Sequence, residues 1–536
     1  MVIPMTSSLA SPPAASDCDA EDLASFGYPQ QLRRRLGSYA SFAAGFSFVS
    51  ILTTVFQLFA FGFSFGGAAF FWTWPLVFGG QLLVAACFAE LAARWPISGC
   101  IYQWSRRLTN PTFGWFTGWF MLIAQIVTVS AAAIALQVVL PVLWSGFQIV
   151  PGDPSLATSS GATNAVLLGS VLIAATTLIN ALGVRLMSRI NSIGVTLELI
   201  GASALIVLLF SHAERSPAAV LHRSGAAPGG YLGVFLASAL MAAYVMVGFD
   251  SAGELSEETR DPRRTAPHAM IRALLASGIG GGLLLLAAIV AAPSLTDGKL
   301  AAGGLPFVLT SRLGTTVGRI FLADVGVAIC VATLAIQTAA TRMTFSMARD
   351  GVLPFSKTLA RVNGRTGTPI MPALVTGFVA AAVLLVNVGQ PALFTDLTSV
   401  VIVMLYGAYL MVTVPLLRAR LKGMEAPTGR TADGSSLFSL GRLGLPINVA
   451  AVLYGGLMMI NIAWPRAAVY DPAGGHWYLR WFSVLFVLGT LAVGILAWLR
   501  QREERTGARA PRPAVLRARG ALLDRARAQA DFAAGE

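Results

Sequence analysis

Residues 231–272 read YLGVFLASALMAAYVMVGFDSAGELSEETRDPRRTAPHAMIR, an apolar run that is long enough to enter a membrane but becomes polar halfway along. Gly248, Asp250, Gly253 and Glu254 fall in its middle, and a basic, proline-flanked loop follows. A glycine beside a carboxylate at membrane depth is unfavourable unless it faces water, a partner or a ligand. We therefore expect a membrane helix that is interrupted here, and we expect the interruption to mark the functional site.

The composition is that of an integral membrane protein. Of the 536 residues, 55% are hydrophobic and only 12% are charged, whereas a soluble domain has about 25% charged residues. The cysteines are scattered without CxxC spacing, so neither a disulfide framework nor a metal site is predicted, and no cofactor is expected. The sequence has no HExxH or GxxxxGKS/T motif, and its histidines fall in or beside loops, so an enzyme or an ATP-driven pump is disfavoured.

Apolar runs of about 17–25 residues, the length that spans a bilayer, occur twelve times along the chain. They cover residues 40–63, 67–91, 112–141, 164–184, 190–211, 231–255, 270–292, 319–346, 370–388, 394–417, 446–464 and 480–499. The sequence therefore predicts an all-α membrane protein with twelve transmembrane helices.

The distribution of Lys and Arg orients these spans. With the N-terminus in the cytoplasm, most of the 38 Lys and Arg residues fall in cytoplasmic loops and in the C-terminal tail. The exceptions are Arg215, Arg223, Lys299, Arg312, Arg319, Arg466 and Arg480. We therefore predict a multi-pass protein of the plasma (inner) membrane with both termini in the cytoplasm. This bias, and attraction to anionic membrane lipid, explain the net charge of +13, so nucleic acid is not a predicted partner.

Two spans that stand five helices apart are both interrupted. The first, YASFAAGFSFVSILTTVFQLFAFGF at residues 39–63, is punctuated near its middle by Gly45, Ser47, Ser50, Thr53 and Thr54. The sixth is punctuated at Gly248, Phe249 and Asp250. Interrupted segments in matching positions of two five-helix halves are typical of inverted-repeat transporters. The alternative is ordinary helix packing, because Ser, Thr and Gly are also common where membrane helices touch.

Four segments carry a family resemblance: GFDSAGELSEETRDPRRTAP at 248–267, FAELAARWPISGCIYQWS at 88–105, GWFTGWFMLIAQ at 114–125 and QTAATRMTFSMARDGVLP at 337–354. Together they resemble landmarks of the amino acid–polyamine–organocation (APC) superfamily, in particular its amino acid/choline transporter branch, which includes GABA permeases. The resemblance extends over nearly all of the membrane region. It implies the five-plus-five inverted-repeat fold of the leucine-transporter type, with helices 1 and 6 broken and two extra helices at the C-terminus.

The expected organisation follows from the spans and from this resemblance. It comprises a disordered cytoplasmic tail without a signal peptide at 1–38, a ten-helix inverted-repeat transport core at 39–417, a cytoplasmic loop at 418–445, transmembrane helices 11 and 12 at 446–500, and a basic cytoplasmic tail at 501–536. Glu257 and Glu258 are expected to pair with Arg260, Arg263 or Arg264 in the basic loop, and Arg342, Arg349 and Asp350 are expected to close the cytoplasmic end.

The resemblance also implies a binding site at the two breaks. A substrate carboxylate would meet the N-terminus of the second half of helix 1 at Ser50, Ile51, Leu52 and Thr53, near the Ser47 and Thr54 hydroxyls. The substrate amine would meet carbonyl groups at Val49 and from Tyr244 to Val247, beside Gly248. Tyr244 and Phe249 would form an aromatic gate, Asp250 would bind an amine or a proton, and Gln125 would face the core. The small GxG-like residues of the family are replaced here by V-S-I-L-T.

Glu198 is the only ionisable residue well inside the fifth apolar run. Its position resembles one where some superfamily members place a lysine near helices 1 and 8. A carboxyl group there can take up a proton or balance a cation, and we expect it to couple proton movement to transport, with Asp250, Thr338 and Thr341 as further candidates. The alternative is a buried glutamate that is hydrogen-bonded to a neighbouring Ser or Thr.

The function predicted from these observations is secondary active transport of an amino acid or a related amine such as GABA by alternating access, coupled to protons or to exchange. A polyamine or choline permease, a channel and a non-transporting nutrient sensor on the same fold are the alternatives. The expected partners are the small-molecule substrate, protons or a counter-substrate, and membrane lipid. The sequence does not indicate an oligomeric state.

Overall fold

The computed structural model describes residues 15–507 apart from 224–229, 297, 386–387, 389–392, 426, 428–435 and 472–473, and helices are the regular elements of this part of the chain. In chain order they are α1 (Ala15–Ser25), α2 (Ser38–Val49), α3 (Ile51–Gly66), η1 (Gly67–Trp72), α4 (Thr73–Arg94), α5 (Cys100–Leu108), α6 (Pro111–Ile134), α7 (Leu136–Leu143), η2 (Ser145–Phe147), α8 (Ser159–Leu182), α9 (Val184–Ser211), η3 (Pro217–Leu221), α10 (Tyr231–Val245), α11 (Ser251–Glu254), η4 (Ser256–Glu258), α12 (Pro262–Ala291), α13 (Gly298–Arg349), α14 (Ser356–Leu359), α15 (Ile370–Leu385), α16 (Leu393–Leu421), η5 (Gly441–Leu443), α17 (Gly444–Ala463), α18 (Ala467–Tyr470), α19 (Trp477–Arg480) and α20 (Phe482–Gly507).

Local signals in the sequence set several of the helix boundaries. Asn110 accepts a hydrogen bond from the Phe113 N–H at the start of α6, where Pro111 occupies the first turn, as expected of a capped N-terminus. Thr158 caps α8 in the same way, and Gly183, with φ of 134°, separates α8 from α9. These boundaries therefore follow from the chemistry of single residues.

The helices are those of a multi-pass membrane protein. Among the described residues, nine helices or runs of helices are long and apolar enough to cross a membrane. One of these runs, Ser38–Arg94, contains both the first and the second predicted span. The predicted sixth and ninth spans fall on shorter apolar helices, Tyr231–Val245 and Ile370–Leu385. Every predicted span thus overlaps a helix of the described chain.

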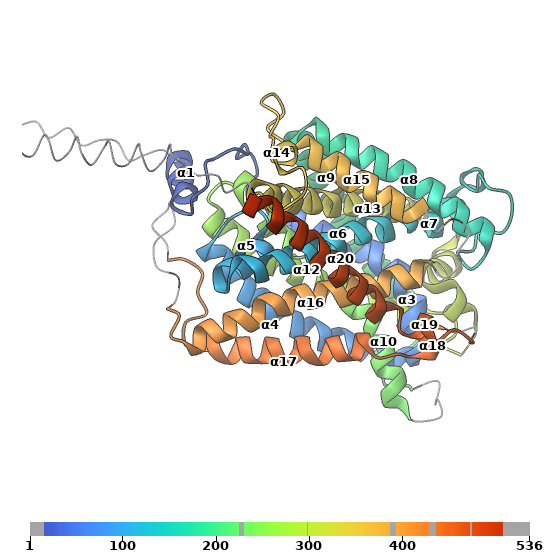
Figure 1. Cartoon of the computed structure of the whole chain (residues 1–536). Helices are drawn as coiled ribbons and strands as arrows, with labels where there is room; N and C mark the ends of the chain where they lie inside the picture. The colour runs from blue at the N-terminus through green and yellow to red at the C-terminus, as the bar shows by residue number, and fades with distance from the viewer. Residues whose placement is uncertain are drawn as a thin grey trace, which may run out of the picture.

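The helices form a bundle whose long axis runs across Figure 1, with α8, α9 and α15 along one flank and α4 and α17 along the other. We call the end that carries α1 and α5 the α1 end, and the end that carries α18 and α19 the α18 end. Four pairs of helices whose predicted spans stand five apart pack on each other: α3 on α10, α4 on α12, α6 on α13, and α8 on α15.

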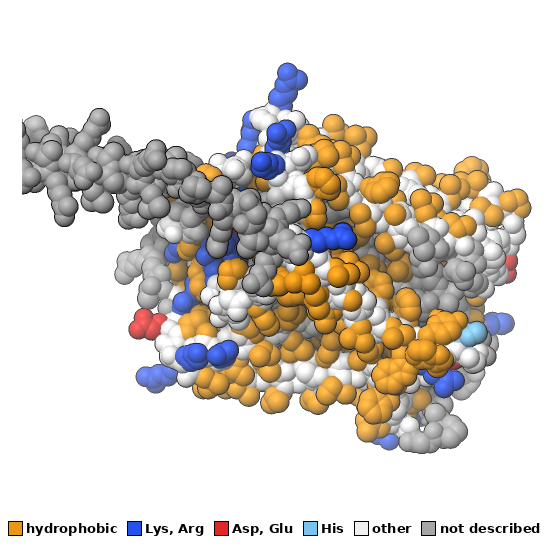
Figure 2. Space-filling model, viewed as in Figure 1, with side chains coloured by type: hydrophobic (Ala, Val, Ile, Leu, Met, Phe, Trp, Pro, Cys, Tyr) orange, Lys and Arg blue, Asp and Glu red, His pale blue; other side chains and the backbone are white. Residues whose placement is uncertain are grey.

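The surface of the bundle is apolar along its length. Large side chains such as Val171, Ile200 and Leu457 are more than 60% exposed, which is typical of helices that face lipid. On the face drawn in Figure 2, hydrophobic side chains cover the flank between the two ends, and most of the Lys and Arg side chains lie toward the α1 end.

The segment before α2 is more ordered than the sequence suggested. Residues 1–14 lie outside the described part, but Ala15–Ser25 form α1, so the prediction of disorder is wrong for residues 15–38. The N–H of Leu36 donates to the Glu258 carbonyl at 2.9 Å, and the N–H of Arg260 donates to the Leu36 carbonyl at 3.0 Å. The backbone of this segment therefore pairs with the chain that follows α11, and this pairing holds it in place.

Candidate functional site

The first apolar span is broken at Ser50. This residue has φ of 36° and ψ of 90°, and it separates α2 from α3. Its hydroxyl lies 2.6 Å from the Thr53 hydroxyl, and the Thr54 hydroxyl donates to the Ser50 carbonyl at 2.8 Å. A non-glycine residue with positive φ is uncommon, and such strain is concentrated at functional sites. The interruption predicted in helix 1 is therefore present, at the Ser50–Thr54 hydroxyl cluster.

Glu198 of α9 occupies the N-terminus of α3. Its Oε1 accepts hydrogen bonds from the Ser50 hydroxyl at 2.9 Å and from the Leu52 N–H at 3.1 Å. The side chain is 1% exposed, and its Oε2 is buried without a hydrogen-bond partner. A carboxylate is stabilised at a helix N-terminus by free N–H groups and by the helix dipole. The half-helix that was predicted to receive a substrate carboxylate thus already holds a carboxyl group of the protein.

The second break follows α10, which ends at Val245, and α11 begins only at Ser251. Between them, Gly248 has φ of 92°, and its N–H donates to the Tyr409 hydroxyl at 2.9 Å. The hydroxyl group of a tyrosine on α16 therefore stabilises the backbone at this break.

Gly248→Ala is expected to disrupt this break. A Cβ on Gly248 would stand 1.7 Å from Cδ1 of Phe48, and φ of 92° is itself unfavourable for alanine, by about 1–3 kcal/mol. We expect a large fall in the yield of monodisperse protein and in its apparent melting temperature. Gly233→Ala in α10 is the control, because a Cβ there meets no atom within 4 Å and should leave stability unchanged or slightly raised. Equal behaviour of the two variants would contradict the role of Gly248.

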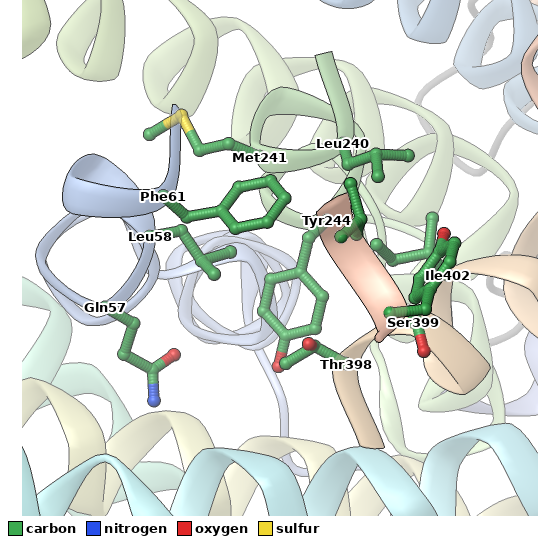
Figure 3. Close-up of a pocket in the computed structure, with 11 residues that line it drawn as sticks. Gln57, Leu58, Phe61, Leu240, Met241, Tyr244, Thr398, Ser399 and Ile402 are labelled. Carbon is green, nitrogen blue, oxygen red and sulfur yellow. The ribbon is translucent and has the colours of Figure 1, made fainter. Parts of the chain in front are cut away.

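Two cavities lie beside the breaks. The inner cavity, about 20 Å³, is lined by Phe48, Thr53, Thr54, Gln57, Thr128, Ala132, Tyr244, Val247, Ala332, Ile336 and Val401. The outer cavity, about 160 Å³, is lined by Gln57, Leu58, Phe61, Leu240, Met241, Tyr244, Thr398, Ser399, Ile402, Val469 and Tyr470. Gln57 and Tyr244 line both, and Val469 and Tyr470 of α18 place the outer cavity toward the α18 end. Figure 3 shows Gln57, Leu58 and Phe61 on one side of the outer cavity, with Tyr244 between them and Thr398 and Ser399.

Among the predicted substrate ligands, the structure brings Thr53, Tyr244 and Val247 to the inner cavity. Ile51 points elsewhere, because its Cδ1 lies beside Gly280 of α12. The Ser47 hydroxyl instead donates to the Asn191 side chain of α9 at 2.6 Å. Val49, Ser50 and Leu52 are buried at the break and line neither cavity.

Phe249 packs away from both cavities. Its ring lies 6.0 Å from the ring of Phe88 and 5.6 Å from that of Tyr409, measured between centroids. Of the two aromatic residues predicted to form a gate, Tyr244 lies between the cavities, whereas Phe249 belongs to an aromatic cluster of α4 and α16.

Asp250 also lies outside both cavities, in a buried cluster with Glu254 and Cys100. One ligand atom from each of these three residues lies within 4.8 Å of the others, so the cluster has the dimensions of a metal site. The Cys100 thiol lies 3.5 Å from Glu254 Oε1, and the Tyr409 hydroxyl donates to Asp250 Oδ1. The Gln125 side chain lies against Glu254. Among the described residues neither carboxyl group forms an ion pair, so this buried cluster needs at least one proton or a bound cation.

The two threonines predicted to assist coupling are bonded elsewhere. The Thr338 hydroxyl donates to the Asn180 side chain of α8 at 2.8 Å, and the Thr341 hydroxyl lies 3.4 Å from that of Thr376 on α15. Asp324 of α13 lies near Glu198, and its Oδ2 fills the space beside Gly201.

The α1 end is closed by ion pairs that differ from those predicted. Glu258 pairs with Arg342 at 2.8 Å, and Glu257 pairs with Arg349 at 2.7 Å. The predicted partners in the basic loop were therefore wrong, because α13 brings its arginines closer than the neighbouring sequence does. Asp350 pairs with Arg106 and accepts a hydrogen bond from Tyr102 at 2.7 Å.

Arg342, Arg349 and Asp350 thus all form ion pairs at the α1 end, and Arg263, in the first turn of α12, pairs with Asp22 of α1 at 2.9 Å.

Two broken helices beside a buried cavity are an arrangement that the resemblance implied. The model of the amino acid permease family matches residues 36–491. The chain belongs to the amino acid permease family. The matched range begins at Leu36, just before α2, and ends within α20. Both breaks, both cavities and the buried acidic residues described above belong to the part of the permease that the family shares.

Curated relatives match over most of the permease. It is 25% identical over 506 residues to amino-acid permease BAT1 of Arabidopsis thaliana, an alignment that covers 89% of this chain and 93% of the relative. It is 29% identical over 335 residues to the methylthioribose transporter of Bacillus subtilis, covering 60% of this chain and 70% of the relative. It is 25% identical over 543 residues to the thiamine transporter thi9 of Schizosaccharomyces pombe, covering 91% of this chain and 87% of the relative. These relatives are transporters, not enzymes, and their names show that substrates vary among them.

Sequence reasoning missed two residues of the site. Gln57 lines both cavities, and Tyr409 bonds both the Gly248 N–H and the Asp250 carboxyl group. A lone amide seven residues beyond the Ser50 break was a signal that could have been used, because uncharged polar groups are rare in lipid-facing helices. No such signal marked Tyr409 in the sequence, because its hydrogen bonds to Gly248 and Asp250 depend on how α16 packs against the second break.

Proposed function

We propose that the permease is a secondary active transporter that moves an amino acid or a related amine such as GABA across the plasma membrane by alternating access. In this proposal the α1 end, where basic side chains gather, faces the cytoplasm, and the α18 end faces outward. Both termini are then cytoplasmic. The small-molecule substrate reaches the centre from the outer cavity, and it leaves when the ion pairs at the α1 end open.

The observation that carries this proposal is the convergence of the two breaks on one central space. Ser50 and Gly248 interrupt separate apolar helices, and Thr53 and Val247 beside these breaks line the same inner cavity. An interrupted membrane helix exposes N–H and C=O groups that require partners, and a zwitterion supplies both a carboxylate and an ammonium group. The Leu52 N–H is bonded to Glu198 in this structure, so we propose that main-chain groups at the breaks bind the substrate once Glu198 releases them.

The proposed architecture is twelve transmembrane helices with a five-plus-five inverted repeat in the first ten. Packing of matching helices supports it, since α3 contacts α10, α4 contacts α12, α6 contacts α13, and α8 contacts α15. Each pair joins spans that stand five apart in the predicted order. In an inverted repeat such pairs surround the pseudo-two-fold axis, where the substrate site lies.

Proton coupling through Glu198 is the proposed energy source. An ionised Glu198 holds the Leu52 N–H and repels any second anion from the N-terminus of α3. A proton on Glu198 removes that charge and frees the terminus for a substrate carboxylate. Proton and substrate then bind cooperatively, because each favours the state that admits the other.

Counterflow in proteoliposomes tests the transport proposal. Vesicles preloaded with an unlabelled amino acid substrate should accumulate the labelled compound transiently, and the initial rate should saturate with concentration. A non-transporting sensor would bind substrate without counterflow, and a channel would give flux without saturation. Either of those outcomes would contradict secondary transport.

A further inference from the structure

The outer cavity has the dimensions of a side-chain site. At about 160 Å³ it resembles the engineered cavities of about 150 Å³ that hold a benzene molecule, whereas the inner cavity of about 20 Å³ has room for little more than one water. Thr53 and Val247, each close to one of the two breaks, line the inner cavity, and the outer cavity adjoins it across Gln57 and Tyr244. Binding of a substrate head group at the breaks requires the inner cavity to widen, and such a substrate would extend its side chain into the outer cavity.

The walls of both cavities are free of charge. Every lining residue is aliphatic, aromatic, a hydroxyl residue, the thioether Met241 or the amide Gln57. The buried carboxyl groups nearest to the breaks lie outside these walls, because Glu198 is bonded to α3 and Asp250 is bonded to Tyr409. A charged side chain in the outer cavity would lose its hydration without gaining a counter-charge, which is strongly unfavourable. An uncharged side chain would not meet this penalty.

Gln57 is a polar residue of the cavity walls whose side chain has no hydrogen bond among the described residues. Its Nε2 and Oε1 are both buried and make no hydrogen bond. A primary amide can donate and accept, and leaving such a group unpaired in a buried site is unfavourable by about 1–3 kcal/mol. In Figure 3 its side chain stands across from Thr398 and the Tyr244 ring, so a group that binds it would lie between α3 and α16.

We propose that Gln57 is a specificity-determining residue, and that the permease selects zwitterionic amino acids with a large, uncharged side chain seated in the outer cavity. This inference rests on the proposed transport function and narrows its substrate class. It separates such amino acids from polyamines, choline and amino acids with ionised side chains. Polar side chains such as those of glutamine and tyrosine bond the Gln57 amide, and apolar ones such as those of phenylalanine and methionine fill the same volume.

Binding to the full-length permease in lipid nanodiscs provides the test. The panel contains glutamine, tyrosine, phenylalanine, methionine, glycine, GABA, lysine, glutamate and spermidine, each measured by calorimetry. The wild-type protein should bind the large uncharged amino acids at least about tenfold more tightly than lysine, glutamate or spermidine. Gln57→Leu should weaken binding of glutamine and tyrosine about tenfold, the loss expected when a buried polar group is left unpaired, and should leave phenylalanine and methionine little changed.

Gln81→Leu is the matched control. Gln81 of α4 is also fully buried, with an amide that makes no hydrogen bond, but it lines neither cavity, so its substitution should leave the ranking of ligands intact. Gln57→Glu keeps the shape of the side chain and adds a negative charge. This variant should bind lysine more tightly, relative to the uncharged amino acids, than the wild-type protein does. This variant keeps the proposal testable if Gln57→Leu fails to fold.

Three results separate the possible failures. Lysine or glutamate binding as tightly as phenylalanine would overturn the proposed side-chain site. Identical ligand rankings for Gln57→Leu and Gln81→Leu would also overturn it, even if counterflow shows a working transporter. If no amino acid or amine binds the wild-type protein, the transport proposal itself fails, and the side-chain site fails with it.

Discussion

Glu198→Gln should abolish uptake driven by a proton gradient while leaving counterflow largely intact. The glutamine carbonyl can still accept hydrogen bonds from the Ser50 hydroxyl and the Leu52 N–H, so α3 keeps its partner. The amide carries no charge and does not ionise in this pH range, so it does not repel a substrate carboxylate from the N-terminus of α3 at any external pH. In proteoliposomes, wild-type uptake should rise when the outside is acidified, and uptake by the variant should not respond.

Glu214→Gln is the matched control for that experiment. Glu214 lies beyond the end of α9 at Ser211, and a hydrogen bond from Arg312 lowers the pKa of its carboxyl group, so it stays ionised through the neutral range. Its substitution should leave the response to external pH unchanged. A proton-driven accumulation that survives Glu198→Gln would show that coupling resides elsewhere, with the buried Asp250 and Glu254 as the next carboxyl groups to examine.

Arg342→Met is expected to cause the largest loss of stability. Arg342 and Glu258 are 1% and 0% exposed, and the substitution leaves the Glu258 carboxylate buried without its counter-charge. Removal of one member of a buried pair is destabilising by about 3–5 kcal/mol. A marked fall in the apparent melting temperature, followed by tryptophan fluorescence in detergent, is the expected result.

The double variant Arg342→Met with Glu258→Met should recover much of that loss, since two apolar side chains can replace a buried pair at little cost. Arg106→Met provides a comparison at the same end of the bundle. Asp350, the partner of Arg106, keeps hydrogen bonds from Tyr28 and Tyr102, so the effect should be clearly smaller. Equal losses for Arg342→Met and Arg106→Met would contradict the importance of the fully buried pair.

The spans and the breaks could be predicted because their signals are local. Hydropathy locates a helix in lipid whatever its neighbours are, and a glycine beside a carboxylate at residues 248–250 is unfavourable in any continuous membrane helix. The hydroxyl cluster around Ser50 gave the same kind of signal, and the structure breaks helix 1 at that residue. Glu198 was also found from its own sequence alone, as an isolated charge in an apolar run.

The directions of side chains could not be predicted in the same way. Phe249 turns toward Phe88 and Tyr409 because the positive φ of Gly248 rotates the residues that follow it. Glu257 and Glu258 pair with arginines of α13 that are distant in sequence. Glu258 and Arg342, for example, are 84 residues apart. Such contacts depend on helix packing, which the local pattern does not encode.

The backbone pairing between Leu36 and the chain after α11 joins the half-helices α2 and α11 at the α1 end. If that end opens to release substrate, either the two half-helices swing outward as one unit or the amides of Leu36 and Arg260 become exposed to water. Deuterium exchange at these two amides would therefore report the motion directly. Slow exchange during turnover would indicate that the backbone hydrogen bonds stay formed and the two half-helices move together, and fast exchange would indicate that these hydrogen bonds break in every transport cycle.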